Sequence, residues 1–383
     1  MIRSLGHAGT HRRVAINVGA GFVPGTNAVI LGAALAGGKL GWEMVGIRNG
    51  FEGLLHPERY PDGGLVTLSP ALIEDLDPAT GGILGQAPWA DPLHARATNG
   101  DQPVEEVDLS GELSRRLSEE GIDSLISIVG VPGLSILQSL CFKGLHTVCI
   151  PRSIENDIAC TAVSFGFNTA LSVTIEMLNK AFQAARSARK IAVVEVTGEH
   201  AGWIALQAGI AARADAVLIP EIPCKLKSVA ARLKDKISPR RPYGLVVVAE
   251  GAKFLDPSPK LAEESDITSL NPASPRPAAG QVAGMVASSL QELTSMETYP
   301  LATGAWARGG NPTALDHQLG MAYGAGAVQV LKGGGNGLMM SFAPPDMKSV
   351  PLADAVNKRR TVPPDSEFLR IGLSLGIYPG IGL

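Results

Sequence analysis

The sequence has 383 residues, of which 45% are apolar and 5% aromatic, and its formal net charge is −3. A chain of this length exceeds one ordinary domain, so we expect two lobes with aliphatic α/β cores. The weak net charge and the lack of a Lys/Arg-rich block disfavour nucleic-acid partners. No apolar run reaches the roughly 18 residues that cross a bilayer, which disfavours a membrane protein.

The first predicted elements are a strand over 13–18, the glycine turn Gly19-Ala20-Gly21, and a helix over 27–35. This order presents backbone N–H groups and a helix N-terminus to a phosphate. The same pattern also describes an ordinary strand-to-helix turn, because glycine-rich turns join many such pairs.

The rest of the chain alternates in the same way. Strands are predicted at 42–47, 124–128, 147–150, 190–196, 216–220 and 243–249. Helices are predicted at 107–120, 169–189, 204–212, 225–237, 281–293 and 311–331. This alternation predicts a mainly parallel sheet in each lobe. The segment 61–110 is predicted to be irregular, and the tail from 344 is rich in proline and charged residues.

The four cysteines have no metal or redox spacing. They form no CxxC pair and lie in or near apolar segments: Cys141, Cys149, Cys160 and Cys224. Residues 1–13 hold no apolar stretch of the kind a secretory signal needs. We therefore expect buried thiols in a reducing cytoplasm.

A polar cluster, Pro151–Ile158, follows the predicted strand 147–150. In open α/β sheets, ligands bind where strands end. Glu155 and Asp157 are two residues apart, so in an extended segment they point the same way. One carboxylate could take a proton from a hydroxyl while the other holds a metal ion, as phosphoryl transfer requires. The spacing also fits a polar loop that only caps a helix.

This cluster resembles the signature loop of the phosphofructokinase family, Pro-Lys-Thr-Ile-Asp-Asn-Asp-Ile. Five further segments resemble family motifs in the family's order: 19–27, 165–170, 193–199, 246–251 and 303–310. The resemblance covers most of the chain and implies two Rossmann-like α/β lobes with mainly parallel sheets. It implies a donor lobe, 1–166 plus 307–357, and a sugar lobe, 167–306 plus 358–383.

The resemblance also implies an activity. Such an enzyme moves a phosphoryl group from ATP or pyrophosphate, with Mg²⁺, to a hydroxyl of a sugar or sugar phosphate. Glu155 takes the place of the family's general base, and Asp157 that of its second, metal-associated aspartate. Donor contacts fall on Gly19, Gly21, Gly130 and Arg152. Sugar contacts fall on Ser153, Gly198, Glu199, Glu250 and Arg308, and on Lys190, which matches an arginine that reaches in from a neighbouring subunit. A homodimer or homotetramer is implied as well.

Several donor-side positions depart from the family pattern. Val131 stands where an aspartate helps to hold magnesium, and a valine offers no oxygen ligand. Phe22 replaces an aspartate, and Pro88 replaces a donor-binding arginine. Arg152 keeps the cation of pyrophosphate-using members and favours that donor.

The sugar side departs too. Tyr299 and Ala305 replace an arginine and a histidine that grip the sugar 6-phosphate, and Glu199 replaces an arginine. A carboxylate beside a dianionic phosphate repels it, so we expect an altered phosphate grip. Three functions remain open at this point: a phosphofructokinase, an enzyme with a different acceptor, or a degenerate paralogue that binds a metabolite or supports a partner subunit.

Overall fold

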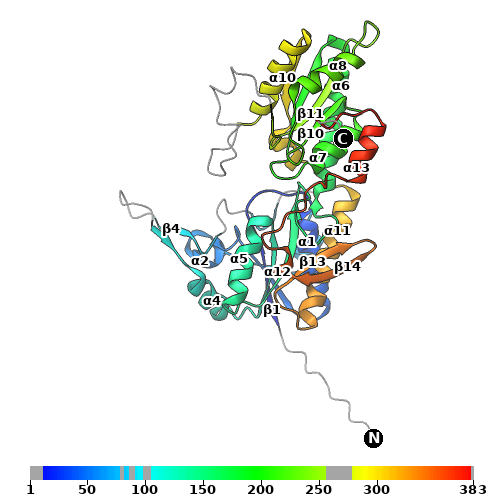
Figure 1. Cartoon of the computed structure of the whole chain (residues 1–383). Coiled ribbons are helices and arrows are strands. Elements are labelled where there is room, and N and C mark those ends of the chain that lie inside the picture. Colours follow the sequence, from blue (N-terminus) through cyan, green and yellow to red (C-terminus); the bar gives the residue numbers. More distant parts are fainter. Residues whose placement is uncertain (1–11, 78–81, 86–90, 98–104, 256–277, 381–383) are drawn as a thin grey trace. The chain divides into compact units, whose positions relative to one another are not determined.

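A computed structural model describes residues 12–77, 82–85, 91–97, 105–255 and 278–380, which form two compact units (Figure 1). The first unit takes the chain up to Ser153, then Ile158–Gly166 and Asn311–Lys358. The second takes Ile154–Asp157, Phe167–Gly310 and the chain from Arg359 onward. Each unit is an α/β fold, as the sequence predicts.

The sheet of the first unit has parallel strands at its centre and antiparallel strands at its edges. Its order is β14 (Asp346–Pro351), β13 (Leu338–Ala343), β7 (Thr147–Ser153), β6 (Ser124–Val129), β1 (Arg13–Val18), β2 (Glu43–Ile47) and β3 (Leu65–Thr67). A short strand, β8 (Phe165–Gly166), pairs with β7. All six residues of β6 are buried, as expected for a strand covered on both faces.

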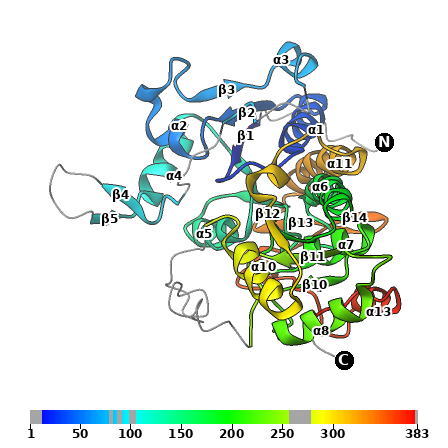
Figure 2. The same cartoon turned by 90° about the horizontal axis from the view of Figure 1, so that it is seen from above.

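Two helices of the first unit, α1 (Thr26–Lys39) and α11 (Ala314–Lys332), lie side by side (Figure 2). Glycines let them approach closely. A Cβ atom at Gly32 would lie 2.3 Å from the Met321 carbonyl oxygen, and one at Gly324 would lie 2.1 Å from the Val29 carbonyl oxygen. The remaining helical elements of this unit are α2 (Glu52–Leu55), η1 (Pro57–Arg59), α3 (Pro70–Glu74), α4 (Ser110–Glu119), α5 (Val131–Phe142) and α12 (Leu352–Ala355).

The second unit is built on a four-stranded parallel sheet. The strand order is β10 (Ala216–Leu218), β11 (Gly244–Ala249), β9 (Ile191–Val196) and β12 (Thr298–Ala302). Valines of β9 and β11 form its core with apolar residues of neighbouring helices. The helical elements are α6 (Phe167–Ala188), α7 (Trp203–Ala211), α8 (Leu226–Lys236), α10 (Gln281–Thr294), η3 (Gly304–Arg308) and α13 (Glu367–Ser374).

The prediction of irregular structure was wrong for residues 61–110, which contain β3, α3 and a small antiparallel pair, β4 (Ala95–Ala97) and β5 (Glu105–Val107). The hairpin β13–β14 was not predicted, and its second strand lies in the tail. β3 and β14 are edge strands with exposed positions, so they lack the continuous apolar run that marks a buried strand. Among the described residues, no helix combines the length and apolar character needed to cross a bilayer.

The segment Ile154–Asp157 packs with the second unit, whereas the sequence predicts an unbroken first segment up to residue 166. Hydrogen bonds to the C-terminal part of the chain explain this placement. Arg359 and Arg360, which belong to the second unit, hydrogen-bond to Asp157 and Asn156. The polar cluster is therefore divided, with Arg152 and Ser153 in the first unit.

Candidate active site

Three parallel strands of the first unit, β7, β6 and β1, are neighbours, so their carboxyl ends share one edge of the sheet. The residues predicted to contact the donor, with Ser153, lie at the ends of these strands: Gly19, Gly21, Gly130, Arg152 and Ser153. The carboxyl ends of β1 and β6 are joined by a hydrogen bond of 3.0 Å from the Gly19 N–H to the Ile128 carbonyl. The structure therefore brings this predicted set together.

Arg152 binds the glycine turn rather than pointing into solvent. The residue is 2% exposed. Its Nη2 donates to the carbonyl oxygen of Gly19 at 2.5 Å and also to that of Ala20. In a trans peptide the N–H points opposite to the carbonyl, so the N–H groups of Ala20 and Gly21 face away from the guanidinium. The sequence predicts a direct phosphate contact for Arg152; in the structure its Nη2 is hydrogen-bonded to two backbone carbonyls.

Two helices begin at this same edge. α1 starts after Gly25, which has a φ of 90°, and α5 starts after Gly130; neither has a side-chain cap. Their first backbone N–H groups and dipoles favour a phosphate. Pro132 in the first turn of α5 removes one of those N–H groups, and Val131 adds no ligand oxygen. Pro88, by contrast, lies outside the described residues.

The predicted catalytic carboxylates sit on a tight turn of the second unit. The sequence predicts extended backbone that points Glu155 and Asp157 the same way. That prediction was wrong, because Asn156 between them has a φ of 55° and lies in the left-handed region. Asparagine tolerates this conformation better than most residues. Asn156 is 2% exposed, so the turn is a packed feature.

Glu155 holds its proton unusually well. Burial raises its pKa to about 7, and the charges of Asp157 and Glu250 add to the effect, while Arg308 opposes it and Glu199 adds to it. A carboxyl group of this pKa is poised to accept or release a proton near neutrality. This is the property a general base for a hydroxyl needs.

Asp157 is held by an arginine. Its Oδ2 accepts a hydrogen bond of 2.5 Å from Nη1 of Arg359, and its side chain is 7% exposed. Its carbonyl oxygen accepts from the Arg360 N–H at 2.8 Å. Among the described residues, no group of three or more His, Cys, Asp or Glu could hold a metal ion. The Asp157 carboxylate is paired with the Arg359 guanidinium, which a divalent cation at the same carboxylate would repel.

Glu250 and Gly198 meet at the carboxyl ends of β11 and β9. The Gly198 N–H donates to Oε1 of Glu250 at 3.2 Å, and burial raises the pKa of Glu250. Gly251 approaches so closely that a Cβ there would lie 2.0 Å from the Glu199 carbonyl oxygen. Arg308, at the end of η3, lowers the pKa of Glu250 and is exposed.

Lys190 lies at the other end of the same sheet. It precedes β9, whereas Gly198 follows it, and a six-residue strand spans roughly 20 Å. Its ammonium is 2.6 Å from the Glu297 carboxylate. Within its own unit, Lys190 is thus away from Glu250. Tyr299 likewise donates its hydroxyl to the Ala181 carbonyl at 2.8 Å.

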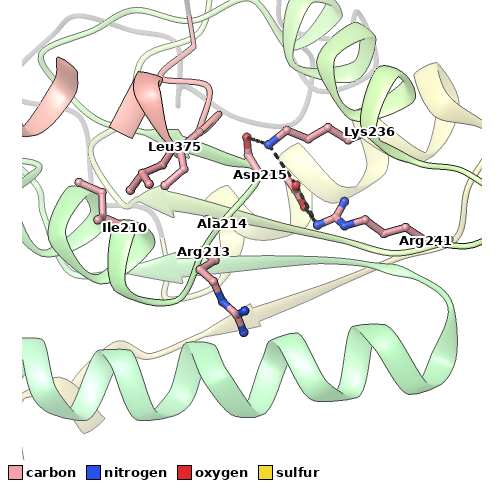
Figure 3. Close-up of a pocket in the computed structure, with 8 residues that line it drawn as sticks. Ile210, Arg213, Ala214, Asp215, Lys236, Arg241 and Leu375 are labelled. Carbon is pink, nitrogen blue, oxygen red and sulfur yellow. Dashed lines mark hydrogen bonds and ion pairs between the residues drawn. The ribbon is translucent and has the colours of Figure 1, made fainter. Parts of the chain in front are cut away.

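A separate pocket of about 380 Å³ opens beside Asp215, at the amino end of β10 (Figure 3). Asp215 is 3% exposed and binds Nζ of Lys236 at 3.2 Å and Nη2 of Arg241 at 3.0 Å. The side chain of Arg213 also lines this pocket. The buried Asp215 carboxylate therefore has two positive partners, Lys236 and Arg241, and a buried charge needs such pairing to offset its desolvation.

A model of the family described as phosphofructokinase matches residues 13–331. The chain belongs to the phosphofructokinase family. An ATP-dependent 6-phosphofructokinase of Chloroflexus aurantiacus is 34% identical, over 97% of this chain and 99% of the relative. A pyrophosphate–fructose 6-phosphate 1-phosphotransferase of Amycolatopsis methanolica is also 34% identical, over 92% and 97% of the two chains.

The fold is also that of solved phosphofructokinases. The crystal structure of a pyrophosphate-dependent phosphofructokinase from Marinobacter aquaeolei matches with a TM-score of 0.73 at 18% identity, over 97% of this chain and 92% of that one. Some relatives are named as ATP-dependent enzymes and others as pyrophosphate-dependent enzymes. Family membership alone therefore leaves the phosphoryl donor open.

Sequence reasoning missed two residues that touch the turn, Arg359 and Arg360. Both lie about 200 positions from Asp157, since the Arg359 contact spans 202 residues. The available signal was the basic run Lys358-Arg359-Arg360 in the Pro- and charge-rich tail. The sequence pattern alone did not indicate that these cations pair with the loop that carries Asp157.

Proposed function

We propose that the chain is a phosphotransferase that moves the terminal phosphoryl group of ATP or pyrophosphate to a hydroxyl of a sugar or sugar phosphate. The observation that carries the proposal is Glu155, whose carboxyl group has a pKa of about 7 and shares its surroundings with Glu250 and Arg308. Family membership supplies the reaction class, and this geometry supplies a proton acceptor suited to it.

In the proposed reaction the acceptor hydroxyl oxygen bonds to the terminal phosphorus. Its proton passes to the Glu155 carboxylate, and the bond from that phosphorus to the bridging oxygen breaks. ADP or phosphate leaves with the electron pair of that bond. Positioning and electrostatics carry most of the catalysis in phosphoryl transfer, and Glu155 contributes by accepting the proton of the hydroxyl that attacks.

The donor is assigned to the first unit. The exposed N–H groups of Ala20 and Gly21 and the N-termini of α1 and α5 supply backbone donors for phosphate oxygens. We propose that Mg²⁺ enters as the complex of the donor, because this ion is commonly bound through substrate phosphates and few carboxylates. Direct calorimetric titration of the ligand-free protein with Mg²⁺ tests whether a resident site exists.

A second acceptor class is favoured by the charges of the second unit. Glu155 and Glu250 both interact electrostatically with the Glu199 carboxylate and with the cation of Arg308, an exposed residue, so carboxylates outnumber cations among these groups. A dianionic sugar phosphate is repelled by that balance, whereas a neutral polyhydroxylated acceptor is not. An unphosphorylated sugar or polyol is therefore the alternative acceptor.

The test is a panel of two donors against phosphorylated and unphosphorylated acceptors, followed by ³¹P NMR. Formation of a new phosphate ester that depends on both substrates supports the proposal; donor consumption without ester rules it out. We also propose a homodimer or homotetramer working in the cytoplasm. Light scattering after size-exclusion chromatography measures the oligomeric state.

A further inference from the structure

The chain returns to the second unit at Arg359, and its first residues lie across the turn that carries Glu155. We call Arg359–Val362 the strap. Arg359 binds the Asp157 carboxylate at 2.5 Å, the Arg360 N–H donates to the Asp157 carbonyl at 2.8 Å, and Nη1 of Arg360 donates to the Asn156 carbonyl at 3.3 Å. Two consecutive arginines thus make three bonds to two neighbouring residues.

The strap is itself fastened to a rigid element. The Arg360 guanidinium carbon lies 4.1 Å from the centroid of a Trp203 ring, and Trp203 Nε1 donates to the Arg360 carbonyl at 2.9 Å. Trp203 is 5% exposed and opens α7. A cation over an indole face is attracted by the negative charge of the ring face.

A second contact of the strap is made by Val362, two residues after Arg360. Glu221 accepts from the Val362 N–H at 2.7 Å and from the Gly202 N–H at 3.0 Å with the same carboxylate oxygen. The strap is therefore tied at both Arg360 and Val362 to the start of α7. Precise sites need this kind of support from outside, because a loop alone leaves its side chains free to move.

The turn needs such support. Asn156 is in the left-handed region with a φ of 55°, which is less favourable for a residue with a side chain than ordinary backbone. The carbonyls of Asn156 and Asp157 lie in buried residues, so each requires a hydrogen-bond donor, and Arg360 supplies one to each. The Asp157 carboxylate has a guanidinium as its positive partner, and a divalent cation on that carboxylate would repel the guanidinium.

We propose that Arg359 is a positioning residue whose guanidinium takes the place of a resident cation at Asp157. Together with Arg360 it fixes the turn on which Glu155 is carried. Asp157 is then the anchor of the strap and not the ligand of a protein-bound metal. The inference rests on the proposed function for its kinetic readout, while its structural readout is independent of activity.

The experiment is a double-mutant cycle with R359M, D157N and the double variant, together with R359K as the conservative change. K358M is the matched control, since Lys358 is exposed, basic and next in sequence. We expect R359M and D157N each to lower kcat about 10–100-fold with each substrate KM changed less than about threefold. The double variant should be no worse than either single one, and R359K should restore part of kcat.

Two further readouts separate the strap from a metal site. Without ligands, amide hydrogen exchange of the turn at 154–158 should rise in R359M and D157N and stay at the wild-type level in K358M. The Mg²⁺ concentration for half-maximal activity should change less than about twofold. Additive losses, or a large rise in that concentration in D157N alone, would overturn the proposal.

Unchanged exchange in R359M would also overturn it, whatever the activity. If wild-type protein transfers no phosphoryl group to any acceptor, the proposed function fails, yet the exchange measurement still decides whether the strap orders the turn. The two failures are therefore distinguishable.

Discussion

Arg152 donates a hydrogen bond of 2.5 Å to the carbonyl oxygen of Gly19, and both residues are buried. The charged side chain of Arg152 is buried, and its hydrogen bonds go to backbone carbonyls. The carbonyl groups of the turn face the guanidinium, so the opposite N–H groups are directed away from it. Arg152, which the sequence predicts to contact the donor, hydrogen-bonds to the carbonyls of the glycine turn.

Removing this guanidinium should weaken donor binding. We expect R152M to raise the donor KM about tenfold or more while leaving the acceptor KM within about twofold, because the turn loses its orientation. Amide exchange at residues 19–22 should rise without any ligand. R115M, which changes an exposed arginine of α4 in the same unit, is the control. Wild-type exchange in R152M would contradict this role.

Activity should rise with pH through the pKa of Glu155. A general base acts as its carboxylate, and burial together with Asp157 and Glu250 places that pKa at about 7. At about pH 6 only roughly a tenth of the molecules are ionised, so kcat should be about tenfold lower than at about pH 8. A kcat that is flat between these values would exclude Glu155 as the base.

The same pKa affects stability with a definite sign. The native state holds the Glu155 proton more tightly than the unfolded state, whose pKa is the ordinary 4.5. Its contribution is therefore fully present below about pH 4.5 and is lost as the pH rises to about 7. E155Q cannot ionise, so it should unfold at a higher temperature than wild type at about pH 8. The difference should shrink toward about pH 5, and a difference independent of pH would contradict the burial argument.

Reversing the charge at Glu199 should change acceptor preference. An arginine there replaces a repelling carboxylate beside Glu155 and Glu250 with a cation. We expect E199R to raise the ratio of kcat/KM for sugar phosphate over unphosphorylated sugar by about tenfold or more. E176R, at an exposed position of α6 in the same unit, should leave the ratio unchanged. Equal ratios in the two variants would remove Glu199 as a determinant of specificity.

The close approach of α1 and α11 is testable by stability alone. G324A places a methyl group 2.1 Å from the Val29 carbonyl oxygen, so the helices must separate. We expect a loss of about 1–3 kcal/mol in the free energy of unfolding. G38A lies on the same pair of helices with nothing within 4 Å of the added atom, and it should be neutral or slightly stabilising. Chemical denaturation of both variants decides the point.

Much of the fold could be predicted because buried parallel strands are continuous apolar runs. β9 and β11 lie within one residue of the expected bounds at each end. β7 extends past its predicted end at Ile150 through Pro151 to Ser153. A proline near the end of a strand is compatible with pairing, but its sequence signal indicates a stop.

The candidate site was less predictable, because side-chain partners far apart in sequence decide its geometry. The glycine turn was found from its pattern, but the interaction of Arg152 with its carbonyls depends on how β7 and β1 are ordered in the sheet. The turn at Asn156 depends on Arg359 and Arg360, which no local pattern connects to it.

The most direct test compares the rate of phosphoryl transfer by wild-type protein and by E155Q at about pH 8, with saturating donor, acceptor and Mg²⁺. The account predicts new phosphate ester from the wild-type protein and a kcat at least about 100-fold lower in E155Q, with the variant still folded. An E155Q protein that transfers phosphoryl groups as fast as wild type would contradict it.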